Sequence, residues 1–128
     1  MGVIRVIKKN PMLSNTGINK VILMGTTSGP FLNVTDRNQE FLCFDLITTE
    51  YIKKGYDQIE HQEYHHIKAS EKLITQESLS IVEGQTLYIE GKIQTTSFVD
   101  EQRIKRYRLE IIANRLDILS TIDAAVSK

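Results

Sequence analysis

Residues 84 to 93 read Gly84-Gln85-Thr86-Leu87-Tyr88-Ile89-Glu90-Gly91-Lys92-Ile93. From Leu87 to Ile93 the odd positions are apolar or glycine, whereas the even positions between them are polar or aromatic. Successive side chains of a β-strand point to opposite faces of the sheet, so this alternation predicts a strand with one buried face. We expect the strand to run from residue 85 to residue 98. Its expected core positions are Leu87, Ile89, Gly91 and Ile93, and its expected outward positions include Tyr88, Lys92, Gln94, Thr96 and Phe98.

Four further segments have the composition of strands. We expect them at residues 20–25, 40–51, 62–69 and 104–119, where apolar, β-branched and aromatic residues alternate with polar ones. Residues 26–30, Thr-Thr-Ser-Gly-Pro, are expected to break the first strand, and a short run at 31–34 follows. Residues 99–103 form an expected hairpin connection between the last two strands.

The hydrophobic spacing changes between the third and the fourth strand. Leu73, Ile74, Ile81 and Val82 fit a period of about 3.6 better than strand alternation. Segment 70–83 is therefore predicted to be a short amphipathic helix, with Gly84 as its C-terminal cap. Five strands with one helix between the third and the fourth is the order of the oligonucleotide/oligosaccharide-binding (OB) fold, a Greek-key barrel. The sequence thus predicts an all-β protein with this barrel, and another small barrel or sandwich with an attached helix is the alternative.

Length and composition are those of one domain. The chain has 128 residues, of which 41% are hydrophobic and 25% charged, which excludes a disordered chain. The 16 basic and 16 acidic residues cancel, so only the distribution of charge can point to a partner. A single cysteine, Cys43, excludes an internal disulfide, and no apolar run approaches the roughly 18 residues of a membrane-spanning helix. We expect a basic arm at residues 1–17, the barrel domain at 18–120, a short polar tail at 121–128, and no membrane association.

Aromatic and basic side chains share the outward faces of the expected strands. Phe98 has the same parity as Lys92 in the fourth strand. In the third strand, Tyr64 shares its parity with His66 and Lys68. Further basic residues gather near the last hairpin and beside Tyr51, namely Arg103, Lys105, Arg106 and Arg108, and Lys53 and Lys54. Aromatic rings stack on bases and cations neutralise phosphates, so the pattern is typical of proteins that bind single-stranded nucleic acid. The alternative is that these aromatic residues are cross-strand or subunit contacts.

One cluster has the side chains of a metal site. His61, Glu63 and His65 have equal parity, and two imidazoles with a carboxylate are suitable ligands for zinc or iron. However, the spacing is not that of the helical His-Glu-x-x-His motif, and the same parity continues into the expected core at Ile67 and Ala69. The sequence also contains no phosphate-binding glycine loop and no nucleophile elbow. We therefore expect a protein that is not an enzyme and holds neither metal nor cofactor, with a metal-dependent enzyme as an alternative.

Several segments resemble the bacterial and mitochondrial single-stranded DNA-binding proteins. Residues 19–25, Asn-Lys-Val-Ile-Leu-Met-Gly, look like the opening strand of that family, and residues 64–67, Tyr-His-His-Ile, are similar to its Trp-His-Arg-Val/Ile strand. The glycine-bounded stretch 84–93 is very close to the family's Lys-Gly-x-x-Val/Ile-Tyr-Ile/Leu-Glu-Gly-x-Leu pattern. The resemblance continues through 98–100 and 106–107 and covers residues 18–120.

The resemblance implies roles for individual residues. Tyr64 takes the place of a base-stacking Trp, Phe98 that of a second stacking aromatic, and Tyr51 lies near a third. His66 replaces an Arg of the DNA-binding face. His65 falls where the family has a histidine near the subunit contact, to which Tyr88 is also assigned, and the family's basic positions are matched by Lys20, Lys72 and Arg106. The family likeness implies a homotetramer that binds single-stranded DNA and can interact with replication proteins.

Some positions depart from the family pattern. The sequence contains no Trp, Ser70 stands where an aromatic is frequent, and Gln94 and Thr96 stand where basic residues are frequent. These differences predict weaker binding to DNA or a smaller salt dependence than in a typical member. The sequence also lacks the acidic tail ending in Pro-Phe by which bacterial members of the family recruit partners. The resemblance therefore favours a mitochondrial member, in the nucleoid of the matrix, over one from the bacterial cytoplasm.

The predicted function is therefore sequence-independent binding of single-stranded DNA during DNA replication and repair, by aromatic stacking and phosphate neutralisation. The alternative is an OB-fold protein-interaction module of a replication complex that binds DNA weakly, which would fit the zero net charge and the missing aromatics. The residues expected to contact DNA are Tyr51, Tyr64, His66, Phe98, Lys20, Lys53, Lys54, Lys68, Lys72, Lys92, Arg103, Lys105, Arg106 and Arg108.

Overall fold

A computed structural model describes residues 16–120 of the chain. The basic arm expected at 1–17, as far as residue 15, and the tail expected at 121–128 lie outside the described residues. Within the described range the elements are β1 (Val21–Asp36), β2 (Gln39–Lys54), β3 (Asp57–Ser70), α2 (Glu71–Gln76), β4 (Thr86–Val99) and β5 (Lys105–Ser120). The strands close a barrel in the order β1-β2-β3-β5-β4. The predicted all-β, five-stranded barrel with a helix after the third strand is confirmed.

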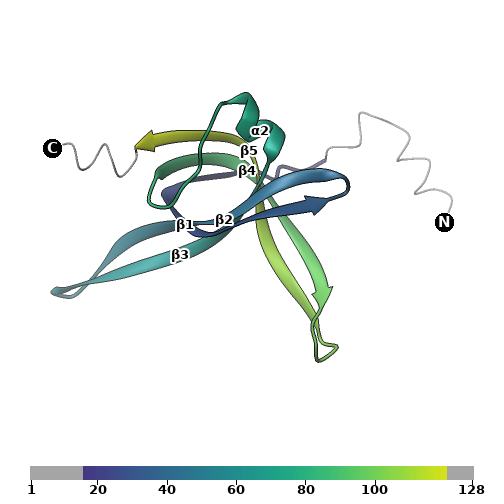
Figure 1. Cartoon of the computed structure of the whole chain (residues 1–128). Coiled ribbons are helices and arrows are strands. Elements are labelled where there is room, and N and C mark those ends of the chain that lie inside the picture. The colour runs from purple at the N-terminus through teal and green to yellow at the C-terminus, as the bar shows by residue number, and fades with distance from the viewer. Residues whose placement is uncertain (1–15, 121–128) are drawn as a thin grey trace.

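Two long hairpins extend out of the barrel in different directions (Figure 1). We call them the β2–β3 arm (residues 47–64) and the β4–β5 arm (residues 94–110). The ladder of the β2–β3 arm continues to Lys54 opposite Asp57, past the ends expected at residues 51 and 62. The ladder of the β4–β5 arm continues to Val99 opposite Lys105. Outside the barrel both faces of a hairpin contact solvent, so parity no longer separates core from surface there.

The barrel interior is filled by side chains of one parity from each strand. The buried cluster consists of Phe44, Leu46, Ile67, Ala69, Leu87, Ile89, Ile111, Ala113 and Leu116. Parity predicted the burial of Leu87, Ile89 and Gly91 correctly. The expectation for Ile93 was wrong, because its side chain is 41% exposed. β1 pairs with β4 only as far as Val21 opposite Gly91, so beyond Gly91 the strand leaves the barrel and enters the β4–β5 arm.

Two glycines allow a close approach of strands in the barrel wall. A Cβ on Gly25 of β1 would collide with the carbonyl oxygen of Ile47, and one on Gly91 of β4 would collide with that of Ile112. Gly91 also follows a register irregularity after Glu90 in the β4–β5 ladder. Glycine at both positions thus permits the bending by which a small barrel closes.

Two expected boundaries were wrong. Residues 26–30 do not end the first strand, because β1 continues to Asp36 with a register irregularity between Ser28 and Leu32. The helix expected over 70–83 ends at Gln76, since Ser78 adopts a positive φ of 54° that helical backbone does not allow. Gly84 is therefore not its cap; it lies in a turn, and its N–H donates to the carbonyl of Thr27 at 3.0 Å.

Among residues 16–120 there is no helix with the length and apolar character needed to span a bilayer.

Candidate nucleic-acid interface

A groove lies between the two arms. β3 and β5 pair in parallel only from Ile67 opposite Ile111 to Ala69 opposite Ala113, and ahead of these residues the hairpins diverge (Figure 1). The groove has a volume of about 550 Å³. It is lined by Glu63, Tyr64, His65, His66, Phe98, Tyr107, Arg108, Leu109 and Ile111. The structure thus brings together four residues predicted to contact nucleic acid, from three strands: Tyr64, His66, Phe98 and Arg108.

Basic side chains surround an aromatic ring on the β4–β5 side of the groove. Phe98 is 43% exposed and lies opposite Arg106 in the ladder. The guanidinium carbon of Arg108 lies 5.3 Å from the centroid of the Phe98 ring. This contact holds a positive charge next to an exposed aromatic surface. The wall can therefore offer neighbouring contacts to a base and to its phosphate.

Asp100 organises the turn between β4 and β5. Its Oδ1 accepts hydrogen bonds from the backbone N–H groups of Gln102 and Ile104, both at 2.9 Å. Its Oδ2 accepts one from Arg106 Nε at 2.8 Å. The N–H of Ile104, followed by the guanidinium of Arg106, holds the pKa of Asp100 below its usual range. The carboxylate thus holds Arg106 near the turn and offsets part of its charge.

The β2–β3 side of the groove carries an aromatic ring beside a hydrogen-bonded histidine and carboxylate. Tyr64 is 56% exposed and lies opposite Ile47 of β2. Two residues nearer the barrel, His66 Nδ1 lies 2.7 Å from Oδ1 of Asp45, the opposite residue of β2. His66 and Arg108 also border a second hollow of about 370 Å³ over β1, β2, β3 and β5. This side of the site therefore combines a stacking surface with a histidine–carboxylate pair, whereas the β4–β5 arm places the guanidinium of Arg108 beside its aromatic ring.

Sequence parity missed three residues of the site. Tyr107 and Leu109 have the opposite parity to Arg108, yet all three line the groove because both faces of the arm are exposed. The signal that could have found Tyr107 is its position between two arginines, and Lys105 Nζ lies 5.6 Å from the centroid of its ring. Asp45 was missed because its contact with His66 depends on the register of β2 against β3.

Known proteins share this chain's sequence pattern. The sequence model described as the single-strand binding protein family matches residues 18–119. The chain belongs to this family. It is 36% identical over 107 residues to a single-stranded DNA-binding protein of Bacteroides thetaiotaomicron, which covers 80% of the chain and 66% of that relative. The chain thus spans about two thirds of the length of this relative, and 68% of a Chlorobaculum tepidum relative that is 33% identical.

Solved structures of family members have the same fold. A Plasmodium falciparum single-strand binding protein in complex with single-stranded DNA superposes with a TM-score of 0.67 at 18% identity, covering 84% of this chain and 97% of that chain. A mitochondrial single-stranded DNA-binding protein from S. cerevisiae superposes with a TM-score of 0.61 at 15% identity, covering 83% of this chain and 99% of that chain. At these identities the similarity shows the fold, and it confirms the OB barrel expected from the sequence.

Lys68 of this family member is part of the folded framework. The expectation that it faces outward as an available cation was wrong, because its side chain is only 9% exposed. Its Nζ lies 2.8 Å from Asp36 Oδ2 and 4.7 Å from the centroid of the Phe41 ring. The hydrogen bond and charge of Lys68 lower the pKa of Asp36. Lys68 thus ties β3 to the turn between β1 and β2.

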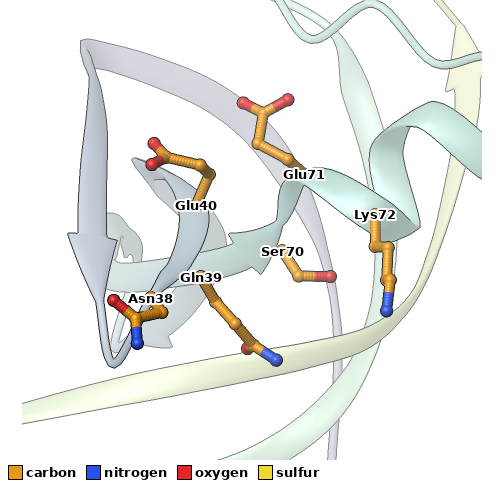
Figure 2. A pocket seen from close by; sticks show the side chains of 6 residues that line it. All are labelled: Asn38, Gln39, Glu40, Ser70, Glu71 and Lys72. Carbon is orange, nitrogen blue, oxygen red and sulfur yellow. The ribbon is translucent and has the colours of Figure 1, made fainter.

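Lys72 lies on a different surface from the groove. It lines a pocket of about 450 Å³ between the β1–β2 turn and the start of α2, with Asn38, Gln39, Glu40, Ser70 and Glu71. In Figure 2 the carboxylates of Glu40 and Glu71 lie to one side and the polar ends of Gln39 and Lys72 to the other. Ser70 caps the N-terminus of α2, because its Oγ accepts a hydrogen bond from the N–H of Leu73 at 3.1 Å. No residue of this pocket lines the groove.

The other predicted cations lie along the arms or on the barrel. Lys53 and Lys54 lie at the tip of the β2–β3 arm, beyond Tyr51, and none of the three lines the groove. Arg103 lies in the turn of the β4–β5 arm, next to Ile104 and Lys105. On the barrel, Lys92 is exposed on β4, and Lys20 Nζ lies 3.9 Å from Glu90.

The two residues assigned to a subunit contact lie in different surroundings. Tyr88 donates a hydrogen bond to Glu90 at 2.5 Å, which raises the pKa of Tyr88. Tyr88 lies opposite Met24 of β1, which is exposed together with Ile22. His65 is half-buried, and its Nε2 lies 2.8 Å from Thr48 Oγ1. An exposed apolar strip flanked by charged residues therefore runs along the outside of β1.

The three residues considered as metal ligands do not converge. His61 Nε2 lies 2.7 Å from Glu63 Oε2, whereas His65 contacts Thr48. Within residues 16–120, no group of three His, Cys, Asp or Glu side chains is arranged to hold a metal ion. The geometry of this part of the chain therefore gives the metal-dependent alternative no support.

Proposed function

We propose that this protein binds single-stranded DNA in the groove between its arms, with little regard to base sequence, during DNA replication and repair. The observation that carries the proposal is that Tyr64 and Phe98, two exposed aromatic rings, line one groove together with Arg108. The names of the two bacterial relatives support it, since both are single-stranded DNA-binding proteins. The P. falciparum structure, described in complex with single-stranded DNA, adds support from the same fold.

Binding would follow from stacking and charge without a chemical step, so we propose a protein that is not an enzyme. Each stacked base is worth about 1–3 kcal/mol, and each neutralised phosphate releases counterions. The central contacts would be Tyr64, His66, Phe98, Arg106 and Arg108, to which the groove adds Tyr107. A longer strand would continue along the arms to Tyr51, Lys53, Lys54, Arg103 and Lys105, and a strand wrapped around the barrel would reach Lys20, Lys72 and Lys92.

Fluorescence anisotropy with labelled oligo-dT and with a duplex of equal length tests the proposal. We expect clear preference for oligo-dT, weakening with salt by a slope of about 0.7 per phosphate contact. Equal affinity for both, or no binding at low salt, would contradict it. If Tyr64→Ala and Phe98→Ala abolish DNA binding but leave the function in cells intact, the protein-interaction module is favoured instead.

We also propose a homotetramer, in which the strip formed by Ile22, Met24 and Tyr88 contacts a second copy of the chain. The apolar residues of this strip are exposed on the outer face of β1, where a second copy would bury them. A charge placed there, Met24→Glu, is expected to lower the mass measured by light scattering, whereas Tyr56→Ala at the tip of the β2–β3 arm should not. An unchanged mass for both variants would place the contact elsewhere.

The cellular compartment proposed here is the bacterial cytoplasm. The two relatives named above come from bacteria, which supports this alternative over the mitochondrial matrix expected from the sequence. Fractionation of the source cells tests it, because recovery of the protein with mitochondrial nucleoids would restore the original expectation.

A further inference from the structure

We propose that Asp45 positions His66 so that the groove binds single-stranded DNA more tightly when the imidazole takes up a proton. The inference rests on the proposed function and names a regulation of the same site. It assigns two roles: His66 is a phosphate contact whose charge depends on pH, and Asp45 is the residue that orients it.

The geometry of the pair determines which ring nitrogen changes its protonation. Asp45 Oδ1 lies 2.7 Å from His66 Nδ1, directly across the β2–β3 ladder. A carboxylate only accepts hydrogen bonds, so Nδ1 carries a hydrogen in both charge states of the ring. A proton taken up by the ring therefore goes to Nε2. The side chain of His66 is 55% exposed and lines the groove, so this proton adds a positive charge at the DNA site.

The charged and titratable groups around His66 come from three strands. They are Cys43 and Asp45 on β2, Glu63, Tyr64, His65 and Lys68 on β3, and Tyr107, Arg108 and Glu110 on β5. The residues contributed by β1 and β4 are Pro30, Leu32, Val34 and Phe98, which do not titrate. Lys68 is paired with Asp36, and burial raises the pKa of the Cys43 thiol further from neutrality. Imidazole is the side-chain type among these that ordinarily changes charge near neutral pH. Of the two imidazoles, His65 is half-buried against Thr48, whereas the side chain of His66 is exposed to the groove.

The chain provides its own controls, because it contains only 3 histidines. His61 does not line the groove and is paired with Glu63 at 2.7 Å. His65 is half-buried and contacts Thr48 at 2.8 Å. His61→Gln therefore removes one exposed imidazole from the same strand without touching the proposed contact.

The test measures the dissociation constant for oligo-dT at constant ionic strength from pH 8 to pH 5.5, a range in which thymine does not titrate. For the native chain and H61Q we expect affinity to rise about tenfold as pH falls. A bound phosphate that raises the pKa of an imidazole by about one unit strengthens binding to the protonated form by that factor. The salt slope should steepen by about 0.7 over the same range. H66Q should bind weakly with no rise, and H66R should bind tightly at both pH values.

Asp45→Leu tests the positioning role, because leucine keeps a branched side chain but cannot accept the hydrogen bond from His66 Nδ1. The variant should bind at least as well as the native chain at pH 8, because a carboxylate near the phosphates is gone, but its rise at low pH should shrink to about threefold or less. A residue needed only for folding would change affinity equally at every pH. A full rise in D45L would overturn the positioning role, and a rise that persists in H66Q would overturn the role of His66. Binding that is tight but independent of pH would refute this inference alone, whereas failure to bind oligo-dT at any pH would refute the proposed function.

Discussion

The two arms carry similar aromatic residues in different electrostatic surroundings. On the β4–β5 arm, Phe98 lies opposite Arg106 and beneath the guanidinium of Arg108. At the base of the β2–β3 arm, Tyr64 lies two residues from a histidine that is paired with a carboxylate, and Glu63 also lines the groove. Stacking surfaces are therefore present on both sides of the groove, whereas permanent positive charge is concentrated on one. We infer that both arms hold bases and that the β4–β5 arm supplies most of the salt-dependent part of binding.

Removing the aromatic rings should have the largest effect. Tyr64→Ala and Phe98→Ala should each weaken oligo-dT binding by about 5- to 150-fold, the value of about 1–3 kcal/mol for one stacked base. The double variant should lose more than either, as measured by anisotropy at fixed salt. Tyr56→Ala is the matched control, because Tyr56 is exposed at the tip of the β2–β3 arm and does not line the groove. Native affinity in Y64A alone would show that the strand follows one arm only.

Removing single charges should separate the arms by their salt dependence. Arg108→Gln should reduce the slope of affinity against salt by about 0.7, the effect of one lost phosphate contact on a single strand. Lys53→Gln makes the same charge change at the tip of the other arm and should alter the slope less. Titration of each variant from low to high salt measures both slopes. Equal reductions would contradict the asymmetry and place phosphates along both arms.

Parity predicted the barrel well and the arms poorly, for a physical reason. Leu87 and Ile89 alternate with polar residues because one face of β4 is covered within the barrel. Ile93 has the same parity but lies where β1 no longer pairs with β4. The alternation therefore continues in the sequence beyond the point where the barrel covers one face of the strand. Tyr107 and Leu109 were overlooked for the converse reason, since both faces of the arm are open to the groove or to solvent.

Local sequence patterns do not predict side-chain contacts between strands that are distant in sequence. The groove residues Tyr64 and Phe98 could be identified singly, because each stands out among polar neighbours of equal parity. The pairing of Asp45 with His66 and of Asp36 with Lys68 depends on registers and turns that no local pattern specifies. Lys68 therefore looked the same as an exposed lysine, although it contacts Asp36 and Phe41 on either side of the β1–β2 turn.

Lys68→Met should distinguish a framework residue from a DNA contact. The change keeps the apolar stem but removes the ion pair with Asp36 and the contact with Phe41, so we expect the melting temperature to fall by about 3–5 °C. The salt slope of DNA binding should stay that of the native chain. The same change at Lys92, which is exposed on β4, is the comparison for both the melting temperature and the salt slope. A reduced slope in K68M, with unchanged melting, would return Lys68 to the site.

Asp100→Asn should have the smallest effect on affinity, because it changes two opposing quantities. The carboxylate fixes the position of Arg106 but also offsets its charge. In the variant the guanidinium of Arg106 is less well fixed, but more of its positive charge is available to a phosphate. Because the pKa of Asp100 is lowered in the fold, its contribution to stability is complete above the unfolded value of about 3.9 and is lost as pH falls through the lower folded value. Amide hydrogen exchange at Gln102 and Ile104 measures this directly: protection should be lost at low pH in the native chain and be reduced already at neutral pH in D100N. A loss of affinity in D100N larger than that in R108Q would mean that the fixed position of Arg106 matters more for binding than its charge.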